Sequence, residues 1–151
     1  MSFLDTIILL AAFVGMEVFS WLFHKYIMHG ALWNIHKTHH SKQSHVFELN
    51  DIFSFTFGSI ATLLMFLGFN ELDARFWIGL GITLYGMVYF VLHDFFIHKR
   101  LSTSRPPWNN RYLRGITKAH QAHHQSNKKE DGVSFGLLWV SWKYFAEDKK
   151  K

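Results

Sequence analysis

The chain has 151 residues, a formal net charge of +5, eleven histidines and no cysteine. This length predicts one domain, which we expect to be membrane-embedded over residues 1–151. The lack of cysteine excludes disulfides, iron–sulfur clusters and thiolate zinc sites, so histidine and carboxylate must supply any metal ligands.

The first stretch, residues 3–23, is almost wholly apolar and about long enough to cross a bilayer. Asp5 stands where a secretory signal peptide has basic residues, and no cleavage site follows, so we expect the amino terminus to be mature sequence. The alternative is a buried helix of a soluble protein, which is disfavoured because two similar runs follow. We predict a membrane helix over about 3–29, ended by Gly30.

Two further runs, residues 52–70 and 76–92, carry no charged side chain. Asp73 suits the helix N-cap between them. The runs predict membrane helices over about 51–69 and 74–98, which makes the chain an all-α integral membrane protein with three spans.

Ten of the eleven histidines form two copies of one pattern, H-x4-H followed later by H-x2-H-H. The copies consist of His24, His29, His36, His39 and His40, and of His93, His98, His120, His123 and His124. Imidazole is the commonest metal-binding side chain, so the doubled pattern predicts a metal site built from two half-sites.

Each H-x2-H-H motif falls in a polar segment that we expect to be a short helix, over about 33–43 and about 112–126. Positions i, i+3 and i+4 share one helix face. Each H-x4-H motif ends a predicted span, and its spacing separates the two side chains by about 140° on a regular helix. This predicts an irregular helix end at 24–29 and at 93–98, either a frayed turn or a π-bulge.

Three spans would place every histidine motif on one side of the membrane, together with most lysine and arginine residues. The positive-inside rule makes that side cytoplasmic. Topology thus accounts for the basic residues, and no nucleic-acid motif is present, so we expect no nucleic-acid partner. Residues 132–146 are apolar but short, which favours an interfacial or re-entrant segment over a fourth span.

Ten imidazoles exceed the needs of one metal ion and divide into about five for each of two ions, with open positions left for reactivity. Imidazole suits zinc, copper, iron and nickel alike. A site at the membrane edge favours membrane lipid as neighbour and an apolar substrate, whose C–H bonds call for a redox metal and O2. These features favour a diiron oxygenase or desaturase.

The sequence resembles the integral-membrane diiron hydroxylases and desaturases of the fatty acid hydroxylase superfamily, and more closely the bacterial β-carotene hydroxylases. The resemblance is carried by H-K-Y-I-M-H-G at 24–30, H-K-T-H-H at 36–40, F-E-L-N-D at 47–51, His93-Asp94, His98 and A-H-Q-A-H-H at 119–124. Thr38 and Leu92 are minor departures from the pattern.

The resemblance implies hydroxylation at C3 of β-ionone rings, from β-carotene through β-cryptoxanthin to zeaxanthin. It also implies two iron ions held by all ten motif histidines, O2 as co-substrate, and a ferredoxin-type electron donor. Zinc can replace iron in such a site after purification. Plastid relatives carry leader sequence that is missing here, which favours a bacterial plasma membrane.

Four carboxylates are candidates to accept hydrogen bonds from the histidines, namely Asp94, Glu48, Asp51 and Glu17. Asp51 is equally suited to cap a helix. Glu17 lies two turns before His24 and about 10 Å deeper, so a hydrogen bond between helices suits it as well. We expect His45, outside both copies, to lie on the surface or in a loop.

Two other functions are compatible with the residues alone. The first is the same chemistry on a fatty acyl, sterol or ketocarotenoid substrate, or ketolase activity. The second is a non-catalytic membrane metal- or haem-binding protein, although haem-binding bundles usually place isolated histidine pairs on facing helices.

Overall fold

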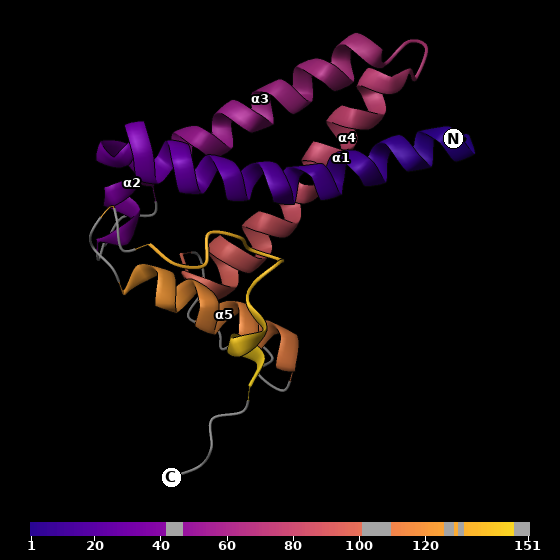
Figure 1. Cartoon of the computed structure of the whole chain (residues 1–151). Coiled ribbons are helices and arrows are strands. Elements are labelled where there is room, and N and C mark those ends of the chain that lie inside the picture. The colour runs from indigo at the N-terminus through magenta and orange to yellow at the C-terminus, as the bar shows by residue number, and fades with distance from the viewer. Residues whose placement is uncertain (42–46, 101–109, 126–128, 130–131, 147–151) are drawn as a thin grey trace.

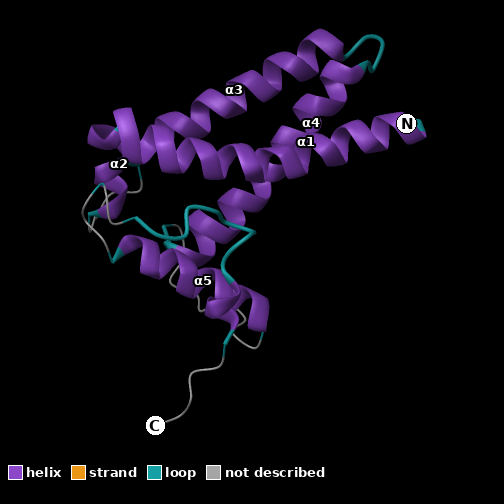
Figure 2. Cartoon of the chain, in the orientation of Figure 1, coloured by secondary structure: helices purple, strands orange, loops and turns teal. Residues whose placement is uncertain are grey.

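The computed structural model describes residues 1–41, 47–100, 110–125, 129 and 132–146, and regular structure in these ranges is entirely helical (Figure 1, Figure 2). The elements are α1 (Phe3–Leu22), η1 (Phe23–Ala31), α2 (Trp33–His40), α3 (Asp51–Gly68), α4 (Ala74–Tyr89), η2 (Phe90–Ile97), α5 (Arg111–His124) and η3 (Trp142–Phe145).

Three helices among the described residues are long and apolar enough to cross a membrane, over Phe3–Ala31, Asp51–Gly68 and Ala74–Ile97. They confirm the three predicted spans. Asp73 caps α4, as predicted, because its side chain accepts a hydrogen bond from the backbone N–H of Arg75.

Helix α4 packs against both α1 and α3. Glycines at the contacts let the backbones approach closely. A Cβ atom at Gly79 would lie 2.6 Å from the carbonyl oxygen of Ala61 on α3, and one at Gly81 would lie 2.6 Å from that of Leu9 on α1. Helices α3 and α4 are joined by a short turn and diverge toward the histidine side of the molecule (Figure 1).

Both H-x4-H motifs coincide with π-helical segments, which favours the π-bulge over a frayed end, and the backbone of the first segment is non-helical at Gly30 (φ −101°, ψ −111°), where that span was predicted to end. The backbone N–H of Leu32 donates to the carbonyl of Ile27 at 2.8 Å, and that of His98 donates to the carbonyl of His93 at 2.8 Å. Bonds of this i+5 type bring residues five apart onto one face of the helix. The H-x4-H spacing is therefore matched to the local backbone.

The polar part of the chain covers the histidine ends of the spans. Helix α5 begins at the Asn110 cap and ends at His124, close to the predicted bounds, while α2 ends at His40. The C-terminal segment contains no helix of spanning length in its described residues, 132–146, and closes with the single turn η3. Positions 42–43 and 126 of the predicted helices, and His45, lie outside the described residues.

Candidate metal centre

The histidines of both sequence copies converge on one region, where their ligand atoms form two groups that each fit within 4.8 Å. Group A consists of His24, His29, His36, His40 and His123, and group B of His39, His93, His98 and His120. The tenth motif histidine, His124, has its ring 4.6 Å from that of His40 and 4.5 Å from that of His120. Its buried Nε2 has no hydrogen-bond partner.

The two groups do not follow the two sequence copies. His39 leaves its own copy to join group B, and His123 leaves the second copy to join group A. On each short helix the first and last histidines of H-x2-H-H are one turn apart, whereas the middle one projects to the side. The rings of His40 and His124 stack between α2 and α5. The middle histidine of each helix, His39 or His123, then lies in the group that is formed mainly by the other sequence copy. The half-sites expected from sequence are therefore interlocked.

In group A, most Nδ1 atoms face oxygen atoms that can only accept. His24 donates to the carbonyl of Phe135 at 2.9 Å, and His123 to that of Val133 at 2.8 Å. His36 donates to the Asn50 amide oxygen at 2.8 Å, and His29 to the carbonyl of Lys129 at 3.3 Å. These acceptors assign the ring proton to Nδ1 and leave Nε2 as a bare lone pair.

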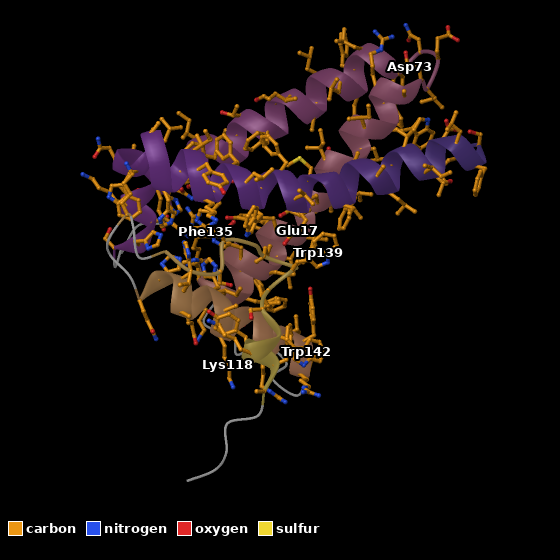
Figure 3. All side chains as sticks on the ribbon, viewed as in Figure 1. Glu17, Asp73, Lys118, Phe135, Trp139 and Trp142 are labelled. Atoms are coloured by element: carbon orange, nitrogen blue, oxygen red, sulfur yellow. The ribbon has the colours of Figure 1, made fainter. Side chains whose placement is uncertain are left out.

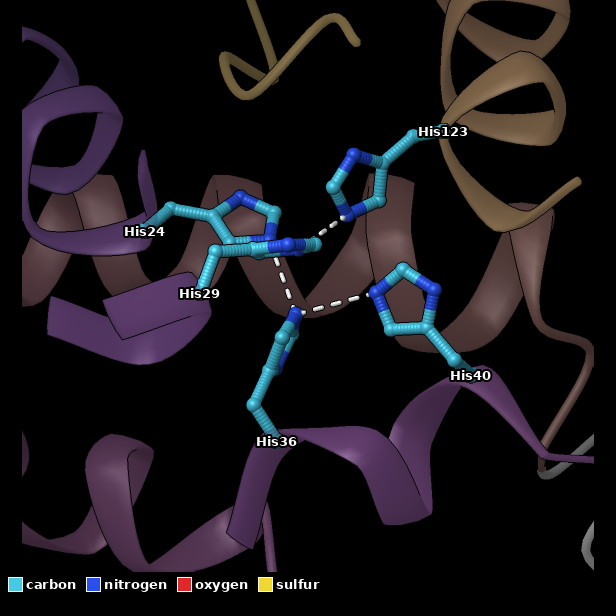
Figure 4. Close-up of side chains that lie close together, drawn as sticks. All are labelled: His24, His29, His36, His40 and His123. Atoms are coloured by element: carbon cyan, nitrogen blue, oxygen red, sulfur yellow. Dashed lines mark hydrogen bonds between the residues drawn. The ribbon is translucent and has the colours of Figure 1, made fainter. Parts of the chain in front are cut away.

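The lone pairs of group A converge (Figure 4). The Nε2 atoms of His24 and His36 lie 2.9 Å apart, and those of His29 and His123 lie 3.2 Å apart. Two lone pairs cannot hydrogen-bond to each other, so this arrangement of Nε2 atoms suits a cation placed among them. Burial, reinforced by neighbouring imidazoles, lowers the pKa of His36 and of His123 to about 3, which excludes protons at neutral pH. The donor set therefore fits a metal ion.

Group B is oriented by carboxylates instead. The Nδ1 atom of His39 donates to Glu48 at 2.8 Å, and that of His93 donates to Asp94 at 3.2 Å, while their Nε2 atoms lie 3.1 Å apart. Burial lowers the pKa of His39 well below its ordinary value, and that of His98 to about 3. Group B fits a second metal ion on the same grounds as group A.

The loop at 47–51 and one arginine connect these carboxylates. Arg100 donates to Asp51 at 2.6 and 2.8 Å and to Asp94 at 2.9 Å. Asp51 in turn accepts the backbone N–H of Glu48 at 3.0 Å. Asp51 therefore contacts no histidine directly through these bonds and acts on group B through its neighbours.

Sequence reasoning missed two of these partners. Asn50 directly precedes α3 but makes no side-chain capping bond there, and its amide oxygen accepts from His36 instead. From the sequence, Arg100 counted only among the basic residues of the predicted cytoplasmic side. In the structure it forms ion pairs with Asp51 and Asp94. The signal that could have pointed to both was the density of polar groups around the F-E-L-N-D motif, which is unusual next to an apolar span.

An apolar cavity of about 750 Å³ lies among the three spans and reaches both groups. His24 of group A and His93 of group B both line it. Phe55 and Met87 also line it and are 67% and 61% exposed, so the cavity opens on the outer surface of the spans. An apolar molecule could enter from the bilayer and place one end beside the histidines.

Comparisons with known proteins agree with the resemblance carried by the motifs. A family model described as fatty acid hydroxylase matches residues 9–147. The chain is 39% identical over 136 residues to a beta-carotene hydroxylase of Pantoea ananas, covering 90% of this chain and 77% of that protein. It is 38% identical over 135 residues to one of Paracoccus sp. (strain N81106 / MBIC 01143), covering 89% and 83%.

A plant protein is similar as well. The chain is 40% identical over 131 residues to beta-carotene 3-hydroxylase 2, chloroplastic, of Arabidopsis thaliana, which covers 84% of this chain and 42% of the plant protein. No solved structure matches the chain.

Proposed function

Because this chain belongs to the fatty acid hydroxylase family, we propose that it is a carotenoid hydroxylase acting at C3 of β-ionone rings, converting β-carotene through β-cryptoxanthin to zeaxanthin. The bacterial relatives named beta-carotene hydroxylase, aligned over most of both chains, support this substrate class. The observation that carries the proposal is the apolar cavity, which leads from the surface of the spans to both histidine groups.

The residues fit two metal ions, and we assign iron to both. His24, His29, His36, His40 and His123 would hold one ion; His39, His93, His98 and His120 would hold the other, with His124 between the two groups. Bound iron would supply activation of O2 and removal of a hydrogen atom from the ring. Zinc can occupy the same imidazole set in purified protein and would not support this chemistry.

The protein's own groups orient the reactants and exclude water. Oxygen acceptors on Nδ1 hold the imidazole rings so that Nε2 faces the metal position. The apolar walls of the cavity, which include Phe57 and Tyr89, suit a polyene and offer it few polar partners. The substrate's ring end would then meet the histidines while its chain extends among the spans.

We further propose that the protein lies in a bacterial plasma membrane with its histidine side cytoplasmic and receives electrons from a ferredoxin-type donor. The bacterial relatives support the membrane assignment. The basic residues on the histidine side, among them Lys37, Arg111 and Lys118, support the orientation through the positive-inside rule. The same basic residues would attract a small acidic electron carrier, because opposite charges on two proteins steer them together.

Expression in cells that accumulate β-carotene tests the substrate assignment. We expect β-cryptoxanthin and then zeaxanthin to appear, identified by chromatography and mass spectrometry, and cells with an empty vector to retain β-carotene. Unconverted β-carotene beside an expressed, iron-loaded protein would contradict the proposal. A Soret absorption band in the purified protein would instead favour a haem-binding function.

A further inference from the structure

Glu17 is a buried carboxylate inside the first span, with an exposed fraction of 3%. Its Oε1 atom accepts the backbone N–H groups of three consecutive residues, Leu137, Leu138 and Trp139, at 3.1, 2.8 and 2.9 Å. Its Oε2 atom accepts the hydroxyl of Tyr85 on α4 at 2.8 Å. Figure 3 shows Glu17 facing the C-terminal segment that carries Phe135 and Trp139.

The C-terminal segment is built to receive this carboxylate. Successive backbone N–H groups that point at one centre form an anion-binding nest. Gly136 lets the segment come close, because a Cβ atom there would lie 3.1 Å from Glu17 Oε1 and 2.7 Å from the carbonyl oxygen of Trp139. An ionisable group is costly within a span, so four convergent donors indicate a specific role for Glu17.

The same segment, residues 132–139, which we call the strap, supplies acceptors to group A. The carbonyl of Phe135 accepts from His24 at 2.9 Å, and the carbonyl of Val133 accepts from His123 at 2.8 Å. Ser134 lies between these two residues in the left-handed region, with φ 59°, a conformation that costs free energy unless its surroundings impose it. Glu17 accepts hydrogen bonds from residues 137–139 of the strap, which follow Val133 and Phe135 closely in the chain. These bonds therefore hold the two carbonyl groups in position.

Group B does not depend on the strap in this way. His39 is oriented by Glu48 and His93 by Asp94, and both carboxylates lie near Arg100 on other parts of the chain. If the strap moved, His24 and His123 of group A would lose the acceptors that orient them. The acceptors of group B would stay in place.

We propose that Glu17 is a positioning residue for one of the two metal positions: by binding the nest of the strap, it holds the carbonyls that orient His24 and His123. This inference rests on the two-metal centre proposed above. Its consequence is selective, because group A should lose affinity for metal when Glu17 is changed and group B should not. Outer partners of metal-binding histidines each contribute about 10- to 100-fold to metal affinity.

Anaerobic titration of the metal-free, detergent-solubilised full chain with Fe(II) tests the proposal, with bound iron measured after desalting. We expect the parent to bind two Fe(II) ions per chain. In Glu17→Leu we expect one ion to bind with the parent's affinity and the other to bind about 100-fold more weakly, since two histidines lose their acceptors. The readout is metal affinity at each position and does not require turnover.

Three further variants separate positioning from general damage. Gly136→Ala crowds the nest from the strap's side and should weaken the same single position. Glu17→Gln keeps an acceptor oxygen in place and should restore part of the lost affinity. Tyr85→Phe removes the other hydrogen bond of Glu17 but leaves the three N–H bonds, and it should bind two ions like the parent.

Two results would overturn the inference: parent-like binding of both ions in Glu17→Leu, or equal weakening of both. If Glu17→Leu does not fold, Gly136→Ala decides the question by the same criterion. A parent that binds two Fe(II) ions but does not hydroxylate β-carotene would contradict the proposed function alone. A parent that binds fewer than two would overturn the two-metal centre and this inference with it.

Discussion

Replacing His39 with alanine will reduce zeaxanthin formation by more than about 100-fold, beyond the 10- to 100-fold expected for loss of an outer partner of a metal ligand. His39 is the one residue of the first motif copy that joins group B, and its Nε2 lies 3.1 Å from that of His93. Its loss leaves group B with ligands from the second copy alone. Product formed per amount of expressed protein measures the effect.

Two further variants serve as comparisons for His39→Ala, one with a smaller expected effect and one with none. Glu48→Gln retains an oxygen that can accept from His39, so its loss should stay within the 10- to 100-fold range. His45→Ala removes the one histidine outside both motif copies and should retain parental activity. If His39→Ala keeps more than about a tenth of the parent's activity, His39 is not a ligand and the interlocked grouping is wrong.

The Gly58→Phe variant should block the cavity while leaving the metal centre intact. Gly58 on α3 lines the cavity, and nothing lies within 4 Å of a Cβ atom added there, so a side chain can begin at this position without a clash and we expect its ring to take up cavity space. The substrate must then share the cavity with the added ring, and overpacking of that complex by about 1–3 kcal/mol predicts a roughly 5- to 150-fold loss of β-carotene conversion. Conversion and bound iron are measured on the same preparation.

Gly15→Phe is the matched control for steric effects in a span. Gly15 is exposed, has equally open space around an added Cβ atom, and does not line the cavity. It should convert β-carotene as the parent does. Equal activity in Gly58→Phe and the parent, with iron bound in both, would exclude the cavity as the route of the substrate.

The spans and the histidine motifs could be predicted because their signals are local. Uncharged runs specify a membrane helix through length and composition alone. The spacing of His24 and His29 also predicted an irregular helix end, since five residues do not fit one face of an α-helix, and the π-helical turn at 23–31 confirms this.

The pairing of the histidines could not be predicted, because it depends on how distant elements pack. Which group His39 or His123 joins is decided where α2 meets α5, and no local pattern encodes that contact. The carbonyls of Val133 and Phe135 were missed for a related reason, since every residue carries a carbonyl and only the folded chain selects these two. Glu17 was noticed as an acidic residue in a span, and its bond to Tyr85 does join two helices, but its three backbone partners lie more than a hundred residues later.

The most direct test of the account is the origin of the oxygen in the product. Purified protein loaded with iron, supplied with β-carotene and a reduced ferredoxin, is exposed to ¹⁸O₂ in ordinary water, and the product is analysed by mass spectrometry. We predict zeaxanthin with one labelled oxygen on each ring, formed by the parent and absent from His39→Ala. Unlabelled zeaxanthin, or no hydroxylated product from the iron-loaded parent, would contradict an O2-dependent carotenoid hydroxylase.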